Sequence, residues 1–363
     1  MYMNNLFYLK NHFKNKKVLI TGHNGFKGTW MCIIFTFLGA KVIGCGLKKN
    51  NKFTFFRFIK NKIYKNIYVD ICNYNKFSQI IKKEKPLFII HLAAQALVFE
   101  SYKDPIYTFK NNIISSLNLL EILRNYKNKL FVVFITSDKV YKNNEKLSGY
   151  NENSLIGGDD PYSASKASIE MILNSYIKSY LLNKNNIKIS IARAGNVIGG
   201  GDWSDNRIIP DIIKSYFNKK KFIIRNPDSE RPWQHVLEPL FGYIQILIKL
   251  RKNEINSGTI FNFGPSIKNT VKVKNLMKLL ANSLKKENGH SLNYLLRKSD
   301  IKETNILRLN SLKAKNHINW YCKLNIIETI NYTSEWYSSF YKRVNDKEIY
   351  DFSIRQIENY LKK

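Results

Sequence analysis

The chain has 363 residues, 44% of them hydrophobic, which excludes a disordered protein and is enough for one large α/β domain or two lobes. The formal net charge is +32, from 59 lysines and arginines against 27 acidic residues. The lysines are spread through every segment and no basic helix or arm is set apart, so we expect neither a nucleic-acid partner nor a membrane partner.

The cysteines and the N-terminal residues indicate where the protein works. The four cysteines show no paired spacing, which favours a reducing compartment over a disulfide framework. The histidines lack metal-ligand spacing, so no metal site is expected. Residues 1–17 do not resemble a secretory signal, and the longest apolar runs are much shorter than the roughly 20 residues of a membrane span. We therefore expect a cytoplasmic protein.

The first predicted strand, Lys17–Ile20, runs into a glycine-spaced turn, and a helix is predicted from about Thr29 to Leu38. Strand, turn and helix in this order are typical of a dinucleotide site, whose glycines permit a tight turn, approach of a pyrophosphate and close helix packing. The helix N-terminus would bind the phosphates. The residues expected to bind the dinucleotide here are Gly22, Asn24, Gly25, Phe26 and Gly28.

Three further strands follow, over Lys41–Leu47, Ile67–Ile71 and Leu87–Leu92. No acidic residue closes the second strand to hold the adenosine ribose, and Lys48 and Lys49 follow it instead. The sequence therefore leaves both NAD and NADP open. Small residues after the fourth strand would let its end lie against a ligand. Further cofactor contacts are expected from Asp70, Ile71, Ala93, Ala94, Gln95 and Asn112.

The fifth predicted strand, Leu130–Thr136, delivers polar residues to the carboxyl edge of the sheet, where ligands bind in doubly wound folds. Tyr162 and Lys166 follow, four residues apart at the start of a predicted helix, and so on one of its faces. A lysine near a tyrosine favours the phenolate and lowers the pKa of the phenol. The pair is therefore a candidate acid/base near neutral pH.

Strands alternating with helices, with a sixth strand over Ile187–Ala192, predict a doubly wound parallel sheet of Rossmann type. The pattern changes beyond Gly199, which predicts a smaller C-terminal α/β lobe that binds the substrate. The predicted division is a cofactor domain over 1–195, to which 231–264 returns, and a substrate lobe over 196–230 and 265–363. The polar end after about Lys342 is expected to fray.

With these residues in view, the chain resembles the extended short-chain dehydrogenase/reductase superfamily and, within it, the CDP-glucose 4,6-dehydratases. The resemblance extends over nearly the whole chain, and its last two blocks are long and specific. It is carried by the stretches Gly22–Gly28, His91–Gln95, Thr136–Lys139, Gly157–Ser163, Arg193–Trp203 and Arg231–Leu240.

The resemblance implies removal of water from CDP-D-glucose to give CDP-4-dehydro-6-deoxy-D-glucose, with NAD as cofactor, on the way to dideoxyhexoses of surface polysaccharide (O-antigen). It implies that Tyr162 takes the proton of the sugar 4-hydroxyl, while Lys166 lowers the pKa of the tyrosine and holds the nicotinamide ribose. Thr136 would hydrogen-bond the 4-oxygen. Asp138 would protonate the leaving 6-hydroxyl, and Lys139 would assist loss of the C5 proton. Hydride would pass from C4 to NAD and return to C6.

Arginines are scarce in this chain and suit a nucleotide-sugar diphosphate, which guanidinium groups bind bidentately. Ala96 and Phe99 depart from the family, which usually has Pro and Arg there, and this puts the strength of substrate binding in doubt. The resemblance also suggests a homo-oligomer, a dimer or a tetramer. The expected substrate contacts are Ser137, Arg193, Asn196, Arg207, Arg225, Arg231 and His235.

Two alternatives stay open. One is a related NAD-dependent nucleotide-sugar dehydratase or epimerase. The Asp138-Lys139 pair argues against an epimerase, because the epimerases lack it, whereas dTDP-glucose dehydratases carry Asp-Glu there. The other is a non-enzymatic nucleotide-binding scaffold or an RNA-binding protein. Retention of the four residues Tyr162, Lys166, Thr136 and Asp138 argues against a scaffold.

Overall fold

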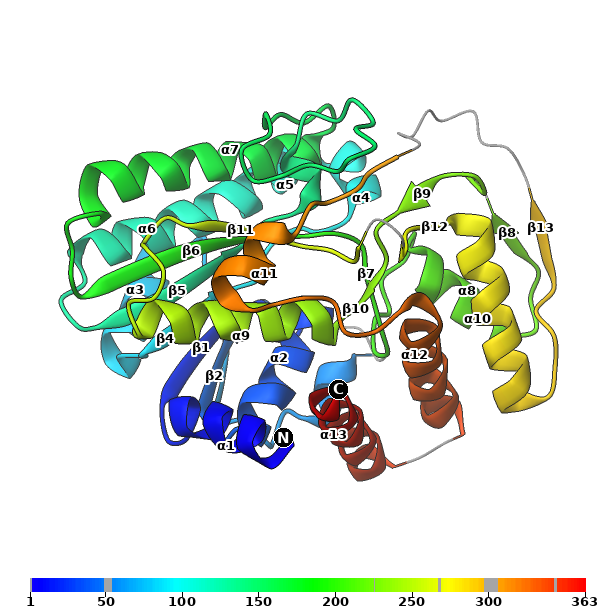
Figure 1. Cartoon of the computed structure of the whole chain (residues 1–363). Helices are drawn as coiled ribbons and strands as arrows, with labels where there is room; N and C mark the ends of the chain where they lie inside the picture. Colours follow the sequence, from blue (N-terminus) through cyan, green and yellow to red (C-terminus); the bar gives the residue numbers. More distant parts are fainter. Residues whose placement is uncertain (1, 49–53, 225, 267–268, 297–305, 343–344) are drawn as a thin grey trace.

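A parallel sheet forms the larger part of the molecule (Figure 1). The computed structural model describes residues 2–48, 54–224, 226–266, 269–296, 306–342 and 345–363. Within these residues the main sheet has seven strands in the order β11-β6-β5-β4-β1-β2-β3, which confirms the predicted doubly wound fold. The strands are β1 (Lys17–Thr21), β2 (Lys41–Gly46), β3 (Lys65–Tyr68), β4 (Phe88–His91), β5 (Leu130–Ile135), β6 (Ile187–Ala194) and β11 (Ile260–Phe263).

Successive strand residues enter different cores because side chains alternate between the two faces of a sheet. Val18 and Ile20 of β1 belong to one apolar cluster, and Leu19 between them belongs to the other. The first cluster includes residues of α2 (Phe26–Phe37) and α9 (Leu237–Arg251). The second includes residues of α3 (Tyr74–Glu84), α6 (Ser115–Asn125) and α7 (Pro161–Tyr176). Helices therefore cover both faces, as a buried parallel sheet requires.

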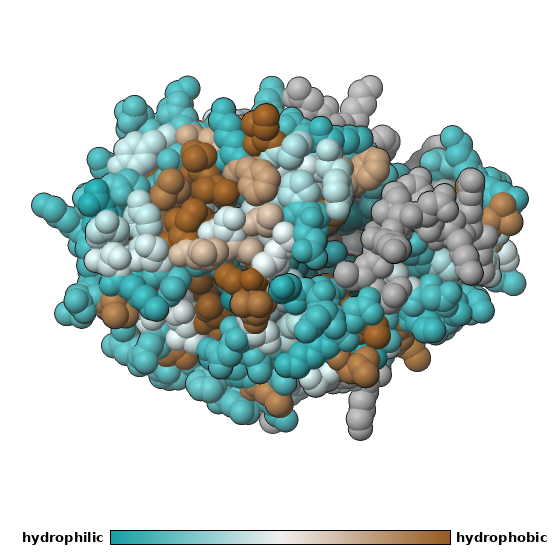
Figure 2. Space-filling model, turned by 90° about the horizontal axis from the view of Figure 1, so that it is seen from above, coloured by the Kyte–Doolittle hydropathy of each residue, from teal (hydrophilic) through white to brown (hydrophobic). Residues whose placement is uncertain are grey.

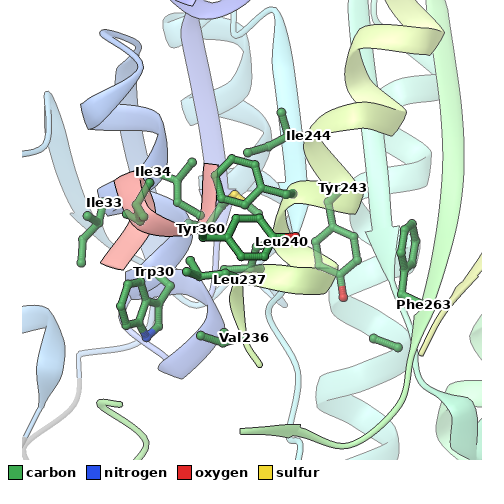
Figure 3. Packing of buried hydrophobic residues seen from close by; sticks show 14 of the residues in the cluster. Trp30, Ile33, Ile34, Val236, Leu237, Leu240, Tyr243, Ile244, Phe263 and Tyr360 are labelled. Carbon is green, nitrogen blue, oxygen red and sulfur yellow. The ribbon is translucent and has the colours of Figure 1, made fainter. Parts of the chain in front are cut away.

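The first cluster joins segments that are far apart in the sequence. Figure 3 shows Trp30 of α2, Leu240 and Tyr243 of α9, Phe263 of β11 and Tyr360 of α13 (Asp346–Lys362) together. The hydroxyl of Tyr360 donates to Oε2 of Glu238 at 2.7 Å. The C-terminal helix is thus tied to α9 and to α2, and Figure 1 shows both chain termini on this side of the sheet.

The smaller part of the molecule carries short strands and three helices. Its two-stranded sheets pair β7 (Val197–Ile198) with β10 (Gln234–His235), β9 (Glu230–Arg231) with β12 (Val271–Lys272), and β8 (Phe222–Ile224) with β13 (Tyr294–Leu296). The helices are α8 (Ile208–Phe217), α10 (Val273–Asn288) and α12 (Ile326–Tyr341). The exact division into two domains stays a prediction. The remaining helical elements are α1 (Tyr2–Phe13), η1 (Phe55–Phe58), α4 (Val98–Lys103), α5 (Pro105–Phe109), η2 (Lys110–Ile114), η3 (Asp138–Val140), η4 (Ile177–Leu181) and α11 (Leu312–Ile318).

Two local predictions were wrong. The third strand is Lys65–Tyr68 and not Ile67–Ile71, because its partner β2 ends at Gly46, which pairs with Tyr68. The chain end does not fray over its described residues: α13 starts at a capping box formed by Asn345 and Glu348, and it buries an apolar face. None of the described helices is long and apolar enough to cross a membrane.

Candidate active site

The glycine turn after β1 is tightly enclosed. Gly22 has φ +67°, and a Cβ added there would lie 2.9 Å from the backbone of Ala93 at the end of β4. A Cβ on Gly28 would lie 2.2 Å from the carbonyl oxygen of Gly22. Both positions therefore exclude a side chain, and the turn lies directly against the neighbouring strand end.

The start of α2 is available to an anion. Gly25 at the N-cap has no side chain to cap the helix, and the first turn, fully described, has no acidic residue. The amides of the first turn and the positive end of the helix dipole therefore suit a phosphate. Asn24 is held beside this turn by its Nδ2, which donates to the carbonyl of Leu47 at 2.6 Å. Phe26 is half-buried against the apolar core.

The residues that follow β2 and β3 have different surroundings. Asp70 is exposed in the turn after β3, where its Oδ1 accepts from the amide of Cys72 at 2.9 Å. Ile71 is buried in the second apolar cluster. Lys48 is exposed after β2, and Lys49 lies outside the described residues. The structure thus gives these residues local roles.

Asn112 connects the β4 end to the Tyr162 helix. It lies in η2, a π-helix of one turn between α5 and α6, and is buried. Its Oδ1 accepts from the Gln95 amide at 2.7 Å, and its Nδ2 donates to Ser165 Oγ at 2.8 Å. Ala93 and Ala94 precede Gln95, and both are half-buried. Asn112 therefore positions two walls of the site.

Tyr162 and Lys166 lie on the buried side of α7, as predicted. Burial raises the pKa of Tyr162; the Ser137 hydroxyl and the charge of Arg207 act to lower it, and Asp138 acts to raise it. The net direction is opposite to the prediction, because burial outweighs the Ser137 hydroxyl and the charge of Arg207. Burial lowers the pKa of Lys166 to about 8, and its Nζ donates to the carbonyl of Ile135 at 3.3 Å.

The hydroxyl beside Tyr162 belongs to Ser137 and not to Thr136, which was predicted to hydrogen-bond the 4-oxygen of the sugar. Thr136 Oγ1 donates instead to Oε1 of the buried Glu170 at 2.6 Å. The two residues follow β5 in extended backbone, so their side chains point to opposite sides. Ser137 Oγ also donates to Asp138 Oδ1 at 3.0 Å, and it accepts from the amide of Lys139.

Asp138 carries a buried carboxyl group just after β5. Its side chain is 3% exposed, and its Oδ2 has no hydrogen-bond partner among the described residues. Burial raises the pKa of Asp138, while the charges of Lys139, Lys27 and Arg231 act against burial. The half-buried Lys139 is thus one of the charges that act on Asp138, and burial of this strand end shifts the carboxyl group towards its neutral form.

The predicted substrate arginines have different surroundings. Arg193 is 2% exposed and forms an ion pair with Glu170, so it is engaged inside the protein. Arg207 donates to Asp202 Oδ2 at 3.1 Å and to the carbonyl of Ala96 at 3.3 Å. Its charge also reaches Tyr162. Arg207 thus joins the smaller part of the molecule to the site, whereas Arg193 does not face it.

The remaining predicted substrate residues divide in the same way. Arg231 lies near enough to act on the pKa of Asp138. Asn196 is half-buried, and its backbone carbonyl accepts from Gln234 at 3.0 Å. His235 is fully buried, packs on the rings of Trp30 and Tyr332, and has its pKa lowered to about 3 by burial. His235 is therefore a core residue. Arg225 lies outside the described residues.

Two residues of the site were not predicted. Burial and the charge of Arg207 lower the pKa of Lys27 to about 7, and Asp138 acts against them. Lys27 lies in the first turn of α2, between Gly25 and Gly28, so its place in the glycine pattern of the sequence indicated the site. Glu170 follows Lys166 by four residues, and continuing the spacing from Tyr162 to Lys166 by one more turn would have identified it.

Comparisons with known proteins agree with this architecture. The family described as GDP-mannose 4,6 dehydratase matches residues 19–333. The chain is 35% identical over 358 residues to a CDP-glucose 4,6-dehydratase from Salmonella typhimurium, covering 97% of this chain and 98% of the relative. It is 32% identical over 275 residues to a dTDP-D-glucose 4,6-dehydratase from Dictyostelium discoideum, covering 69% and 58%.

Solved structures show the same fold. A dTDP-glucose 4,6-dehydratase from Bacillus anthracis in complex with NAD superimposes with a TM-score of 0.74 at 21% identity, covering 90% of this chain and 98% of that one. A UDP-glucose 4-epimerase from Thermotoga maritima with UDP-glucose gives 0.77 at 22% identity, covering 90% and 99%. The predicted resemblance to the CDP-glucose 4,6-dehydratases is confirmed by the full-length relative, and this chain belongs to the GDP-mannose 4,6-dehydratase family.

Proposed function

We propose that the protein is an NAD-dependent CDP-glucose 4,6-dehydratase, a hydro-lyase that converts CDP-D-glucose into CDP-4-dehydro-6-deoxy-D-glucose. The observation that carries this proposal is the buried Asp138 carboxyl group, with one unpartnered oxygen, close to Tyr162. The full-length relative named for this activity supports the choice of nucleotide sugar. The unpaired cysteines agree with a cytoplasmic location, which is part of the same proposal.

The residues present fit a dinucleotide. The glycine turn, which leaves no room for a side chain at Gly22 or Gly28, and the uncapped start of α2 would hold the pyrophosphate. Lys166, beside Tyr162 on α7, would hold the nicotinamide ribose. Bound NAD supplies the acceptor for the C4 hydride and returns that hydride at C6. The NAD complexes of structural neighbours favour NAD over NADP.

The protein's own residues would handle the protons. Tyr162 takes the proton of the sugar 4-hydroxyl, and the nearby charge of Arg207 favours the phenolate that this step needs. Ser137 then replaces Thr136 as the hydroxyl that binds the 4-oxygen. Once C4 is a ketone, the proton on the neighbouring C5 becomes acidic. The half-buried Lys139 removes this proton, and Asp138, whose pKa is raised by burial, donates a proton to the leaving 6-hydroxyl.

A second copy of the chain is part of the proposal. Exposed apolar residues lie on α4, α5 and α7, which pack together. Figure 2 looks down on this side and shows apolar residues gathered in a band within a hydrophilic surround. A band of this kind is typical of an interface between subunits. The exposed large hydrophobic residues on these three helices are Phe99, Tyr102, Ile106, Tyr107 and Met171.

The proposed function is tested by turnover. The purified protein with NAD would be incubated with CDP-glucose, dTDP-glucose and GDP-mannose in parallel, and the 4-keto product would be measured by its absorbance in base. We expect CDP-glucose to be consumed with a kcat/KM at least tenfold above the other two. Preferential turnover of another nucleotide sugar, or a product that keeps the hexose mass, would contradict the proposal.

A further inference from the structure

Glu170 lies behind the proposed catalytic pair on the same helix. It follows Lys166 by one helical turn and Tyr162 by two, so the three side chains share one face of α7. It is 3% exposed, although a carboxylate is rarely buried without compensating partners. Its partners therefore indicate what the carboxylate does.

Those partners come from two strands of the sheet. Thr136, directly after β5, donates to Oε1 at 2.6 Å. Arg193 of β6 donates through Nε to Oε1 at 2.9 Å and to Oε2 at 3.0 Å, and its Nη2 pairs with Oε2. Nη1 of the same guanidinium donates to the hydroxyl of Tyr141 at 2.8 Å. One buried carboxylate thus fastens the ends of β5 and β6 to the helix that carries Tyr162 and Lys166.

We propose that Glu170 is a positioning residue for the catalytic pair: held by Arg193, it fixes α7 against the end of β5 and places a carboxylate one helical turn from Lys166. This inference rests on the proposed function for its effect on turnover. The Thr136 contact explains why Ser137, the next residue, faces Tyr162. Removing the carboxylate should therefore disturb both the geometry and the charge of the site.

The charge argument follows from the groups that face Lys166. Burial lowers the pKa of Lys166, and Glu170 on its own helix acts in the opposite direction. Lys27 of α2 is a like charge that favours the neutral amine, and His91 of β4 has its pKa lowered to about 3 by burial, so it is uncharged. Without Glu170, no acidic group is recorded among the described residues to keep Lys166 protonated.

The direct test is the titration of Lys166 in Glu170→Gln. Lysine labelled with ¹³C and ¹⁵N, with the Lys166 signal assigned by Lys166→Met, reports the midpoint by NMR in the complete enzyme. We expect the midpoint, about 8 in the natural protein, to fall by about one pH unit, a tenfold change in the ratio of charged to neutral amine. The basic limb of the kcat profile should move down by the same amount, and Glu170→Asp should largely restore it.

Tyr141→Phe is the matched control, because it removes a hydroxyl from Arg193 and keeps both charges. It should lower the thermal unfolding temperature without moving the midpoint. If Glu170→Gln does not fold, the double variant Glu170→Gln/Arg193→Gln leaves no unpaired charge and should also lower the midpoint. An unchanged midpoint in whichever variant folds would overturn the inference. Absence of turnover in the natural protein would contradict the proposed function alone, since the NMR titration does not need it.

Discussion

Neighbouring residues at a strand end can have unrelated roles, as Thr136 and Ser137 show. The sequence predicted that this segment reaches the site, because it follows a buried strand. It could not predict which of two adjacent hydroxyls faces Tyr162, since that depends on where the pleat of β5 ends. For the same reason Arg193 seemed suited to a phosphate, although its partner Glu170 lies inside the protein.

Substitutions of Thr136 and Ser137 should therefore have different effects. Ser137→Ala removes the hydroxyl beside Tyr162 and should lower kcat by about 10²-fold. Thr136→Val leaves Glu170 with one donor fewer and should reduce the free energy of unfolding by about 1–3 kcal/mol, with a smaller effect on kcat. Steady-state kinetics and chemical denaturation separate the two. A larger kcat loss in Thr136→Val would restore the original assignment.

At the scale of elements, the ends of strands and helices depend on contacts that the hydrophobic periodicity of the sequence does not show. The sheet was predictable because its strands are continuous apolar runs. The end of β3 was not, because it depends on pairing with β2. Helix α13 was missed because its composition is polar, yet the Asn345-x-x-Glu348 spacing is the sequence signature of a capping box and would have revealed its start.

The start of α2 gives a prediction at this scale. Gly28→Ala places a Cβ 2.2 Å from the Gly22 carbonyl oxygen, so the turn and the helix must separate. We expect NAD affinity, measured by calorimetry, to fall at least tenfold. Gly157→Ala is the control, because its added Cβ meets only the Lys142 side chain at 3.6 Å. Equal NAD affinity in Gly28→Ala and the natural protein would show that this close approach does not shape the binding site.

At the scale of the whole molecule, the apolar band on α4, α5 and α7 predicts a dimer. Sedimentation should give twice the chain mass, and Met171→Glu with Ile106→Glu should reduce it to one chain by placing charge in the interface. Leu312→Glu, which changes an exposed apolar residue on α11, should leave the mass unchanged. A monomeric natural protein, or equal dissociation by the Leu312 change, would refute this interface.

The smaller part of the molecule was the least predictable. Its strands are two or three residues long and pair across large sequence separations, so no local pattern identifies them. Arg207 and Arg231 were nevertheless predicted as substrate contacts, and their charges act on the pKa of Tyr162 and of Asp138. Because arginine is scarce in this lysine-rich chain, each arginine was a candidate substrate contact. The same criterion also selected Arg193, which pairs with Glu170 inside the protein.

The central claim is that one site oxidises a hexose at C4, removes water across C5 and C6, and reduces C6. The most direct measurement is mass spectrometry and NMR of the product formed from CDP-[4-²H]glucose. The account predicts loss of one water, with the deuterium recovered at C6. Deuterium that remains on C4 of a hexose of unchanged mass, or that is lost to solvent, would contradict it.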